Sequence, residues 1–147
     1  MESSQVLLKL REENALTQEQ MANKLHVTRQ AVSRWENGET VPSTELLKQI
    51  SKEFNVSINT LLGNPVTLIC QCCGMPLNDE YISKEKTGEM NESYCMWCYN
   101  EGEFVYKSLE EFMAFLVPHM ASIHNMPEGE IKAMLDKQLP KLTHWNE

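Results

Sequence analysis

The sequence predicts a mainly α-helical chain: a bundle of five helices, then a small cysteine-rich region of short β-hairpins that ends in a helical tail. Three observations lead to this prediction. Apolar residues recur at helical spacing through the first 62 residues. Two Cys-x2-Cys pairs follow, separated by 21 residues. After residue 107 an apolar stripe at i, i+3, i+4 spacing returns.

The second and third predicted helices are joined by a very short turn. Thr17 can cap a helix over residues 18–25 and form a capping box with Gln20. Only residues 26 and 27 precede Thr28, which can cap a helix over residues 28–36. Ala22 is small where the two helices must cross closely. This pattern is typical of a helix-turn-helix.

The third predicted helix separates two kinds of side chain. At about 100° per residue, Ala31, Val32 and Trp35 fall on one side. Long or polar hydrogen-bonding side chains fall on the other: Arg29, Gln30, Ser33 and Arg34. An Arg fork matches guanine O6 and N7, and a Gln amide matches adenine N6 and N7. The helix is therefore predicted to read base edges in the major groove of DNA, with Trp35 in the core.

Two more helices complete the first part of the chain. One begins near Pro42 and Ser43, and a short one follows the turn at residues 55–57. Their apolar positions keep helical spacing: Leu46, Leu47, Ile50, Phe54, Ile58, Leu61 and Leu62. Gly63, Asn64 and Pro65 then break the pattern. We therefore expect two domains, residues 1–64 and 65–147.

Residues 6–62 resemble the lambda-repressor/Cro-like family of helix-turn-helix proteins, also called the XRE family. The resemblance rests on the segments LREENALTQEQMA, VTRQAVSRWENGETVP and LLKQISKEFNVSINTLL. It implies a sequence-specific transcriptional regulator that binds double-stranded DNA as a homodimer. The side chains expected in the major groove are Thr28, Arg29, Gln30, Ser33 and Arg34.

The resemblance also assigns residues outside the base-reading face. It implies that Gln18 and Asn37 contact phosphates and that Arg11 forms a structural ion pair with Glu36. The family usually has Gly at the position of His26, where the backbone is left-handed. His26 therefore predicts mild local strain, roughly 1 kcal/mol.

The charge of the chain is unevenly distributed. The net charge is −8, but residues 1–64 hold seven basic and eight acidic residues, whereas residues 65–147 hold six and thirteen. Lys24, Arg29 and Arg34 cluster on the proposed binding unit, so its local field can be positive. We expect DNA to repel the acidic second part, which should point away from it.

Cys70, Cys73, Cys95 and Cys98 have the spacing of two zinc knuckles. Each pair presents two thiolates to one ion, which together satisfy tetrahedral Zn²⁺. Iron in a rubredoxin-like site is an alternative, because tetrathiolate sites hold either metal. Cys72 is the spare thiol, since Cys70 and Cys73 keep the knuckle spacing and Gly74 follows the second cysteine. The segment between the pairs is polar, with a hairpin turn near residues 84–88.

The segments CQCCGMPL, YCMWCYNEGEF and LPKLTHW resemble the family named "Putative zinc ribbon domain", over about residues 69–145. The resemblance implies a zinc-bound ribbon with a helical tail and no defined activity. A β-prone run at residues 66–69 leads into the ribbon. In the tail, Ser108 with Glu111 predicts a capping box, Pro118 should kink or end the helix, and Pro127 opens a last helix. Trp145 should pack back on the fold.

These observations exclude several classes of protein. No apolar run is long enough to span a membrane, and the N-terminus lacks the pattern of a secretory signal, so we expect a cytoplasmic protein. No Ser-His-Asp group, phosphate loop or catalytic carboxylate pair stands out, which argues against an enzyme. Three functions stay open: a DNA-binding regulator whose zinc-stabilised C-terminal domain mediates interaction or dimerisation, a metal- or thiol-responsive repressor, and a protein-interaction adaptor that does not bind DNA.

Overall fold

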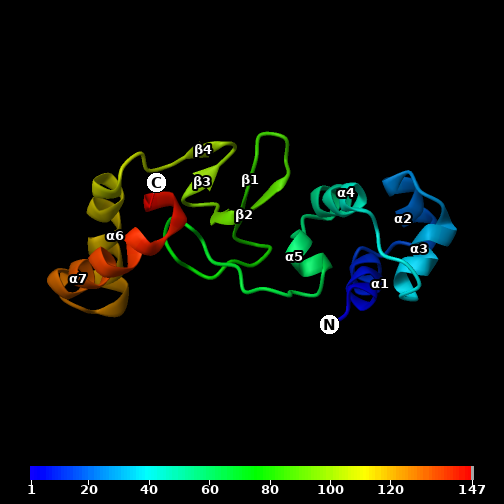
Figure 1. Ribbon diagram of the computed structural model, residues 1–147, viewed down its shortest axis with the longest axis horizontal. Coiled ribbons are helices and arrows are strands. Elements are labelled where there is room, and N and C mark those ends of the chain that lie inside the picture. The colour runs from blue at the N-terminus through cyan, green and yellow to red at the C-terminus, as the bar shows by residue number, and fades with distance from the viewer. Residues whose placement is uncertain (147) are drawn as a thin grey trace. The chain divides into compact units, whose positions relative to one another are not determined.

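The computed structural model describes residues 1–146 and contains two compact units (Figure 1). The first comprises residues 1–67, together with residues 78–80 and 88–90. The second comprises the rest of the described chain from residue 68. The elements are seven α-helices and two small two-stranded sheets within the described residues. The predicted fold class is therefore confirmed.

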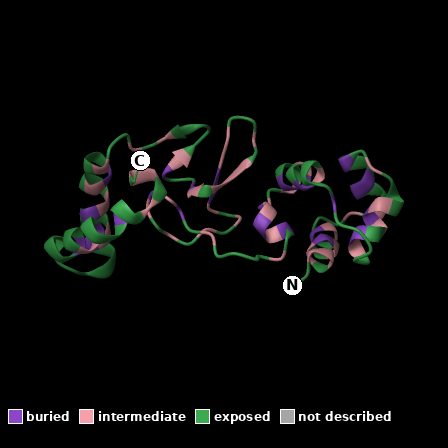
Figure 2. Ribbon diagram, viewed as in Figure 1, coloured by how far each residue is buried: buried purple, intermediate pink, exposed green. Residues whose placement is uncertain are grey.

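The first unit contains the five predicted helices. They are α1 (Ser3–Glu13), α2 (Gln18–Leu25), α3 (Arg29–Glu36), α4 (Thr44–Phe54) and α5 (Ile58–Leu61). Each helix contributes buried positions to one core, which Figure 2 shows in purple along one side of each. That core consists of Leu7, Leu10, Met21, Ala22, Leu25, Val32, Trp35, Leu47, Ile50 and Leu61.

The turn between α2 and α3 has the predicted local chemistry. Thr17 Oγ1 accepts a hydrogen bond from the Gln20 amide at 3.1 Å, and Gln20 Oε1 accepts one from the Thr17 amide at 2.8 Å. The capping box is confirmed. His26 is left-handed, with φ of 55°, as the resemblance to the helix-turn-helix family implied. Thr28 then caps α3 by accepting a hydrogen bond from the Ala31 amide at 3.2 Å.

An ion pair joins α1 to the end of α3. Arg11 Nε donates to Glu36 Oε1 at 2.5 Å, and its Nη2 donates to Glu36 Oε2 at 3.1 Å. A third donor, Nη1, reaches the Leu16 carbonyl oxygen at 2.8 Å. The side chains are only 15% and 5% exposed. This confirms the predicted pair and fixes the base of α3 against α1.

Asp79 supplies an unexpected cap in the first unit. Its Oδ1 accepts hydrogen bonds from the Ser57 amide at 2.9 Å and from Thr60 Oγ1 at 3.1 Å. Ser57 is the N-cap of α5 and is 1% exposed. A residue from beyond Thr67 thus satisfies a buried amide at the start of the last helix of the bundle.

Asp79→Ala is expected to lower the free energy of unfolding of the first unit by about 1 to 2 kcal/mol, because the Ser57 amide loses its acceptor. Asp79→Asn keeps an acceptor oxygen and should recover at least half of that loss. Urea denaturation followed by circular dichroism, with hydrogen exchange of residues 55–62, measures both. The neighbouring exposed side chain provides the control, Glu80→Ala. Equal stability of Asp79→Ala and Glu80→Ala would contradict this role.

The ribbon is built from very short strands: β1 (Ile82–Lys84), β2 (Met90–Cys95), β3 (Tyr99–Asn100) and β4 (Glu103–Phe104). β1 pairs with β2 and β3 pairs antiparallel with β4. The predicted turn near residues 84–88 lies between β1 and β2. The β-prone run at residues 66–69 forms only one bridge, between Ile69 and Pro76. Two backbone hydrogen bonds flank this bridge, from Leu77 to Leu68 at 2.9 Å and from Cys70 to Met75 at 2.8 Å. The pairing goes no further because the chain turns back within the cysteine knuckle and Pro76 has no amide hydrogen to donate.

Two helices form the tail, α6 (Leu109–His124) and α7 (Glu128–Gln138), followed by the 3₁₀ turns η1 (Leu139–Lys141) and η2 (Thr143–Trp145). Among the described helices, none has the length and apolarity needed to cross a bilayer.

One prediction about α6 needs correction, the capping box, and of the two outcomes predicted at Pro118 the structure excludes one, the end of the helix. The helix does not end at Pro118, although proline cannot donate a hydrogen bond to the Ala114 carbonyl. Buried Val117 and Ala121 on either side of Pro118 explain this, because packing offsets one lost hydrogen bond. The capping box is half formed: Ser108 Oγ accepts from the Glu111 amide, but Glu111 Oε2 accepts from the Lys107 amide instead of the Ser108 amide.

Candidate nucleic-acid interface and metal centre

Helix α3 has one face in the core and one in solvent. Val32 is 1% exposed and Trp35 is 4% exposed, so the helix is anchored by its apolar side. The confirmed core position of Trp35 excludes it from base stacking. Thr28, Arg29, Gln30, Arg34 and Asn37 are exposed, and Ser33 is half-buried.

The long polar side chains of α3 are free to bind a partner. Within residues 1–146, the side chains of Arg29, Gln30 and Arg34 make no hydrogen bond or ion pair. Their donors therefore need no existing contact to be broken before they meet a base or a phosphate. This arrangement matches the geometry that direct readout requires, a helix whose exposed face carries Arg and Gln forks.

Gln18 lies at the N-terminus of α2 and is partly engaged. Its Nε2 donates to Glu36 Oε2 at 3.0 Å, a contact that sequence reasoning missed because the residues are far apart in the chain. Glu36 thus links the start of α2 to the end of α3 and to Arg11. One Gln18 N–H and its carbonyl oxygen stay available, and their direction is set by Glu36.

Lys24 was predicted to add to the positive electrostatic potential of the binding unit, but an acidic neighbour reduces its contribution. Its Nζ lies 3.0 Å from Glu53 Oε1, and both side chains are nearly half exposed. An exposed pair of this kind is screened and weak, but it offsets the charge of Lys24. The uncompensated positive charge of the proposed binding unit therefore comes from Arg29 and Arg34.

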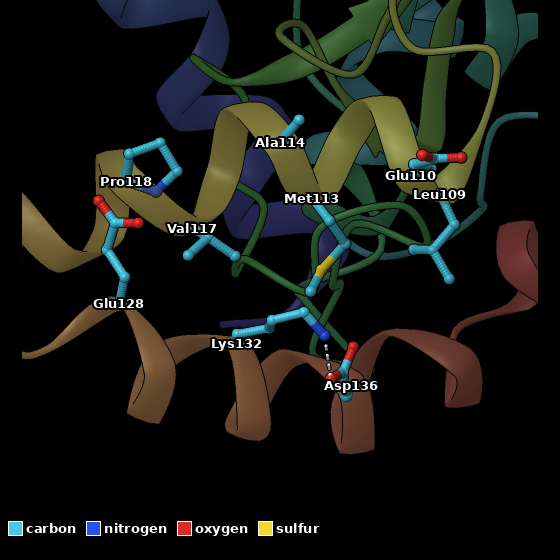
Figure 3. Close-up of a pocket in the computed structure, with 9 residues that line it drawn as sticks. All are labelled: Leu109, Glu110, Met113, Ala114, Val117, Pro118, Glu128, Lys132 and Asp136. Carbon is cyan, nitrogen blue, oxygen red and sulfur yellow. Dashed lines mark hydrogen bonds and ion pairs between the residues drawn. The ribbon is translucent and has the colours of Figure 1, made fainter.

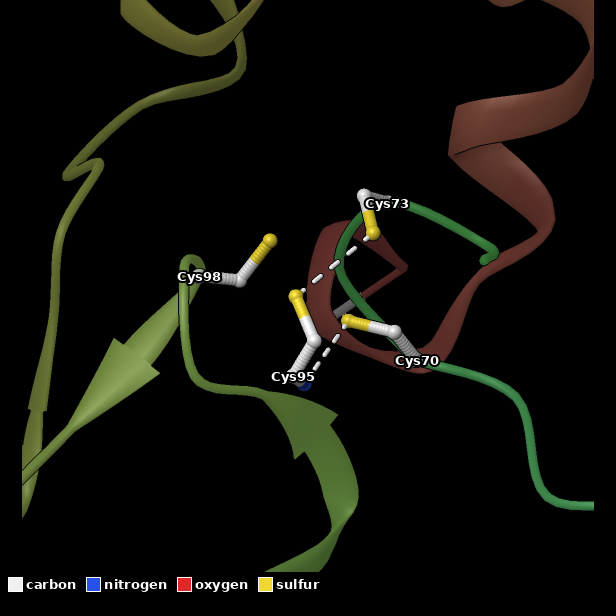
Figure 4. Close-up of side chains that lie close together, drawn as sticks. All are labelled: Cys70, Cys73, Cys95 and Cys98. Atoms are coloured by element: carbon white, nitrogen blue, oxygen red, sulfur yellow. Dashed lines mark hydrogen bonds between the residues drawn. The ribbon is translucent and has the colours of Figure 1, made fainter. Parts of the chain in front are cut away.

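The cysteines that sequence spacing selected lie together in the second unit. The sulfurs of Cys70, Cys73, Cys95 and Cys98 are within 4.8 Å of one another. Figure 4 shows two of them on one loop, with the third at the end of a strand and the fourth before the next strand. The Cys73 and Cys95 sulfurs are 3.8 Å apart. A tetrahedron with Zn–S bonds of about 2.3 Å has edges of about 3.8 Å, so this donor set fits one Zn²⁺.

The electrostatics of the cluster also favour a bound cation. Hydrogen bonding by the Cys73 thiol lowers the pKa of Cys70, whereas hydrogen bonding with Cys70 raises the pKa values of Cys73 and Cys98. Four crowded thiols cannot all ionise unaided, so a divalent metal is needed to hold four thiolates. The Cys95 amide donates to Cys70 Sγ at 3.3 Å, which would further stabilise a metal-bound thiolate.

Cys72 lies outside the group of four sulfurs. It is 1% exposed and belongs to the core of the second unit. Trp145 Nε1 donates to its carbonyl oxygen at 2.7 Å, and the Trp145 ring stacks on Phe112 with centroids 5.6 Å apart. This confirms the prediction that Trp145 packs back on the fold, where it contacts Cys72 and Phe112.

Sequence reasoning missed the aromatic surroundings of the cysteines. A cavity of about 710 Å³ lies beside Cys73, Cys95 and Cys98. Its other walls include Tyr106 and Phe115. These residues come from separate segments of the ribbon and α6, so no local sequence pattern could reveal their meeting.

Two curated proteins are similar to part of this chain. The HTH-type transcriptional activator BcrR of Enterococcus faecalis is 50% identical over 63 residues, which are 43% of this chain and 31% of that protein. Antitoxin PezA of Streptococcus pneumoniae is 40% identical over 62 residues, 39% of each chain. The matched region thus spans 31% of the first relative and 39% of the second, well under half of either.

A crystal structure of a transcriptional regulator from Listeria innocua matches 97% of this chain and 95% of that one, with 21% identity and a TM-score of 0.41. Residues 7–61 match the family described as "Helix-turn-helix", which confirms the resemblance of the first unit. Residues 69–146, more than half of the chain, match the family described as "Putative zinc ribbon domain". The chain therefore belongs to this zinc-ribbon family and carries an N-terminal helix-turn-helix domain.

Proposed function

We propose that this protein is a sequence-specific regulator of transcription that binds double-stranded DNA through α3. The observation that carries the proposal is the exposed, unpartnered face of Arg29, Gln30 and Arg34 on a helix anchored by Val32 and Trp35. The relatives support it, because BcrR is named a transcriptional activator. In this proposal Thr28 and Ser33 also lie in the major groove, and Gln18 and Asn37 contact the flanking phosphates.

Base reading is tested by substitution on a duplex selected from a random DNA pool. Gln30→Ala and Arg34→Ala are each expected to weaken binding by about 1 to 3 kcal/mol and to relax sequence choice at one base pair, because each removes a donor pattern matched to one base. Fluorescence anisotropy at two salt concentrations measures affinity for the selected duplex and its single-base variants.

Gln18→Ala separates positioning from reading. It should weaken binding to every duplex alike, since phosphates carry no sequence information. Lys9→Ala on α1 is the matched charge control for Arg34→Ala and should leave sequence choice unchanged. Equal losses on every duplex for Gln18→Ala, Gln30→Ala and Arg34→Ala would refute the base-reading assignment.

We further propose that residues 1–64 and 65–147 act as separate domains in a cytoplasmic, non-enzymatic homodimer. Two-fold related copies would place their α3 helices in half-sites about 34 Å apart. The second domain would then serve as a zinc-stabilised interaction or dimerisation module. If chains lacking residues 65–147 dimerise and bind the selected duplex as well as the full chain, that role is wrong.

The burial of the thiols bears on the alternative of a thiol-responsive repressor. Four of the five cysteines are buried, and Cys73 is half-buried. Thiol sensors need an accessible thiolate, so the structure favours a structural role for the cysteines. An adaptor without DNA binding would show no salt-dependent affinity for any duplex.

A further inference from the structure

The cavity beside the cysteines, here called the aromatic cavity, has the dimensions of a small-molecule site. Its volume of about 710 Å³ falls within the range of about 300 to 1,000 Å³ typical of ligand pockets. One wall holds Cys73, Cys95 and Cys98. The ring-bearing residues of the lining are Trp97, Tyr106, Phe112, Phe115 and His119.

The mouth of the aromatic cavity exposes apolar side chains to water, and covering them would be energetically favourable. Trp97 is 53% exposed, Val105 is 50% exposed and Phe115 is 49% exposed. These three come from different parts of the second unit yet line the same cavity. Exposed apolar groups gathered around one concave site indicate a binding surface more than scattered surface residues do.

Four of the rings that line the cavity pack on one another. Phe115 stacks with Tyr106 at 5.5 Å between centroids and with His119 at 5.3 Å, and Tyr106 contacts Phe112 at 4.9 Å. Rings held in place by one another lose little further freedom on binding. Trp, Tyr and Phe faces attract cations through their quadrupole.

The charge around the aromatic cavity favours a cation over an anion. No Lys, Arg, Asp or Glu lines it, so the charge that a guest meets comes from the surroundings, where residues 65–147 hold thirteen acidic against six basic residues. Four thiolates around one Zn²⁺ would add a formal negative charge at the cysteine wall.

The second cavity of this unit lacks these features. It lies between α6 and α7 and has a volume of about 600 Å³ (Figure 3). Aliphatic side chains and a charged rim line it, and the Lys132 ammonium pairs there with Asp136 at 2.8 Å. Because no aromatic ring lines it, this cavity serves as the internal comparison.

We propose that the aromatic cavity binds a lipophilic organic cation, a molecule with an aromatic or alkyl body and a delocalised or quaternary positive charge. The negative charge at the cysteine wall and of the surrounding domain attracts the cation, and the apolar lining covers the body. This site does not depend on the DNA-reading role of α3.

Tetraphenylphosphonium and tetraphenylborate provide the test, because they have nearly the same size and shape but opposite charge. Each is titrated to millimolar concentration into the zinc-loaded full chain by calorimetry. The cation is expected to bind one site per chain, at least about ten-fold more tightly than the anion. Absence of cation binding would overturn the proposal, and so would equal affinity for the two ions.

Matched substitutions locate the site. Phe115→Lys and Val105→Lys place an ammonium at the mouth and should each weaken binding of the cation by about ten-fold or more. Ile123→Lys is the control, since Ile123 is 64% exposed on the same helix as Phe115 but does not line the cavity. Zinc content and circular dichroism should be unchanged in all three variants.

Two results of these measurements would contradict a cation in the aromatic cavity. Unchanged affinity in both Phe115→Lys and Val105→Lys would show that the cation binds outside the aromatic cavity. A shift from dimer to monomer in these variants without the probe, measured by light scattering, would show that a second copy covers the cavity. Either result overturns the assignment.

Discussion

Removal of the metal is expected to unfold the ribbon of the second unit. Structural zinc sites contribute on the order of 10 kcal/mol of binding free energy, comparable to the whole stability of a small domain. The strands here are two to six residues long, and four cysteines form part of the core itself: Cys70, Cys72, Cys95 and Cys98. Without the metal, residues 68–107 keep short strands and one group of rings, Tyr94, Tyr99 and Phe104, which we expect to be too few contacts to hold the ribbon.

Chelation of purified protein should therefore release about one zinc per chain and abolish hydrogen-exchange protection across residues 68–107. Cys95→Ser should do the same without a chelator, since it removes one of the four clustered sulfurs at a buried position. The helices α1 to α4 should keep their protection, because no metal ligand lies in their core.

Cys72→Ala is the matched control for Cys95→Ser. Both remove a buried thiol, but the Cys72 sulfur lies outside the group of four, so this variant should retain one zinc. Release of zinc from Cys72→Ala, or an intact ribbon in Cys95→Ser, would contradict the ligand set. Iron instead of zinc in protein purified without added metal would contradict the zinc assignment.

Arg11→Met is expected to destabilise the first unit by about 3 to 5 kcal/mol, because it leaves the Glu36 carboxylate buried without its cation. Glu36 is 5% exposed and would retain only the hydrogen bond from Gln18. A bundle of about 60 residues is marginally stable, so much of its stability would be lost. Urea denaturation and hydrogen exchange of α1 and α3 measure the effect.

A double variant distinguishes a buried charge from lost packing. Arg11→Met with Glu36→Met removes both charges and should recover more than half of the loss. Lys9→Met is the surface control: the Lys9–Glu13 pair is about 60% exposed on both sides, and its loss should change stability by no more than about 0.5 kcal/mol. A double variant as unstable as Arg11→Met would show that packing, not charge, explains the result.

Local chemistry was predictable because it acts within a few residues. The Thr17 capping box and the two faces of α3 follow from spacing and side-chain type, and the structure bears them out. The left-handed backbone at His26, which the family resemblance implied, is also confirmed. Pro118 shows the limit of this reasoning. Its effect on the backbone is local, but burial of the neighbouring residues of α6 decided that the helix continues to His124.

For the cysteines, the sequence predicted the ligand set but not its surroundings. Spacing selected Cys70 and Cys73 over Cys72, and the structure gathers the sulfurs of the selected set within 4.8 Å. The aromatic cavity beside them was invisible in the sequence. Its ring-bearing residues all fit an ordinary core or surface pattern until the fold brings them to one place.

The sequence by itself determined the helices, their caps, the exposed polar face of α3 and the cysteine spacing, because periodicity and turn chemistry act between near neighbours. Only the tertiary structure decided that Gln18 binds Glu36, that Asp79 caps α5 and that aromatic rings surround the cysteine cluster. Each of these contacts joins residues 18 or more positions apart, or joins separate segments. Such long-range contacts depend on how whole helices and strands pack, and a short stretch of sequence does not determine that packing.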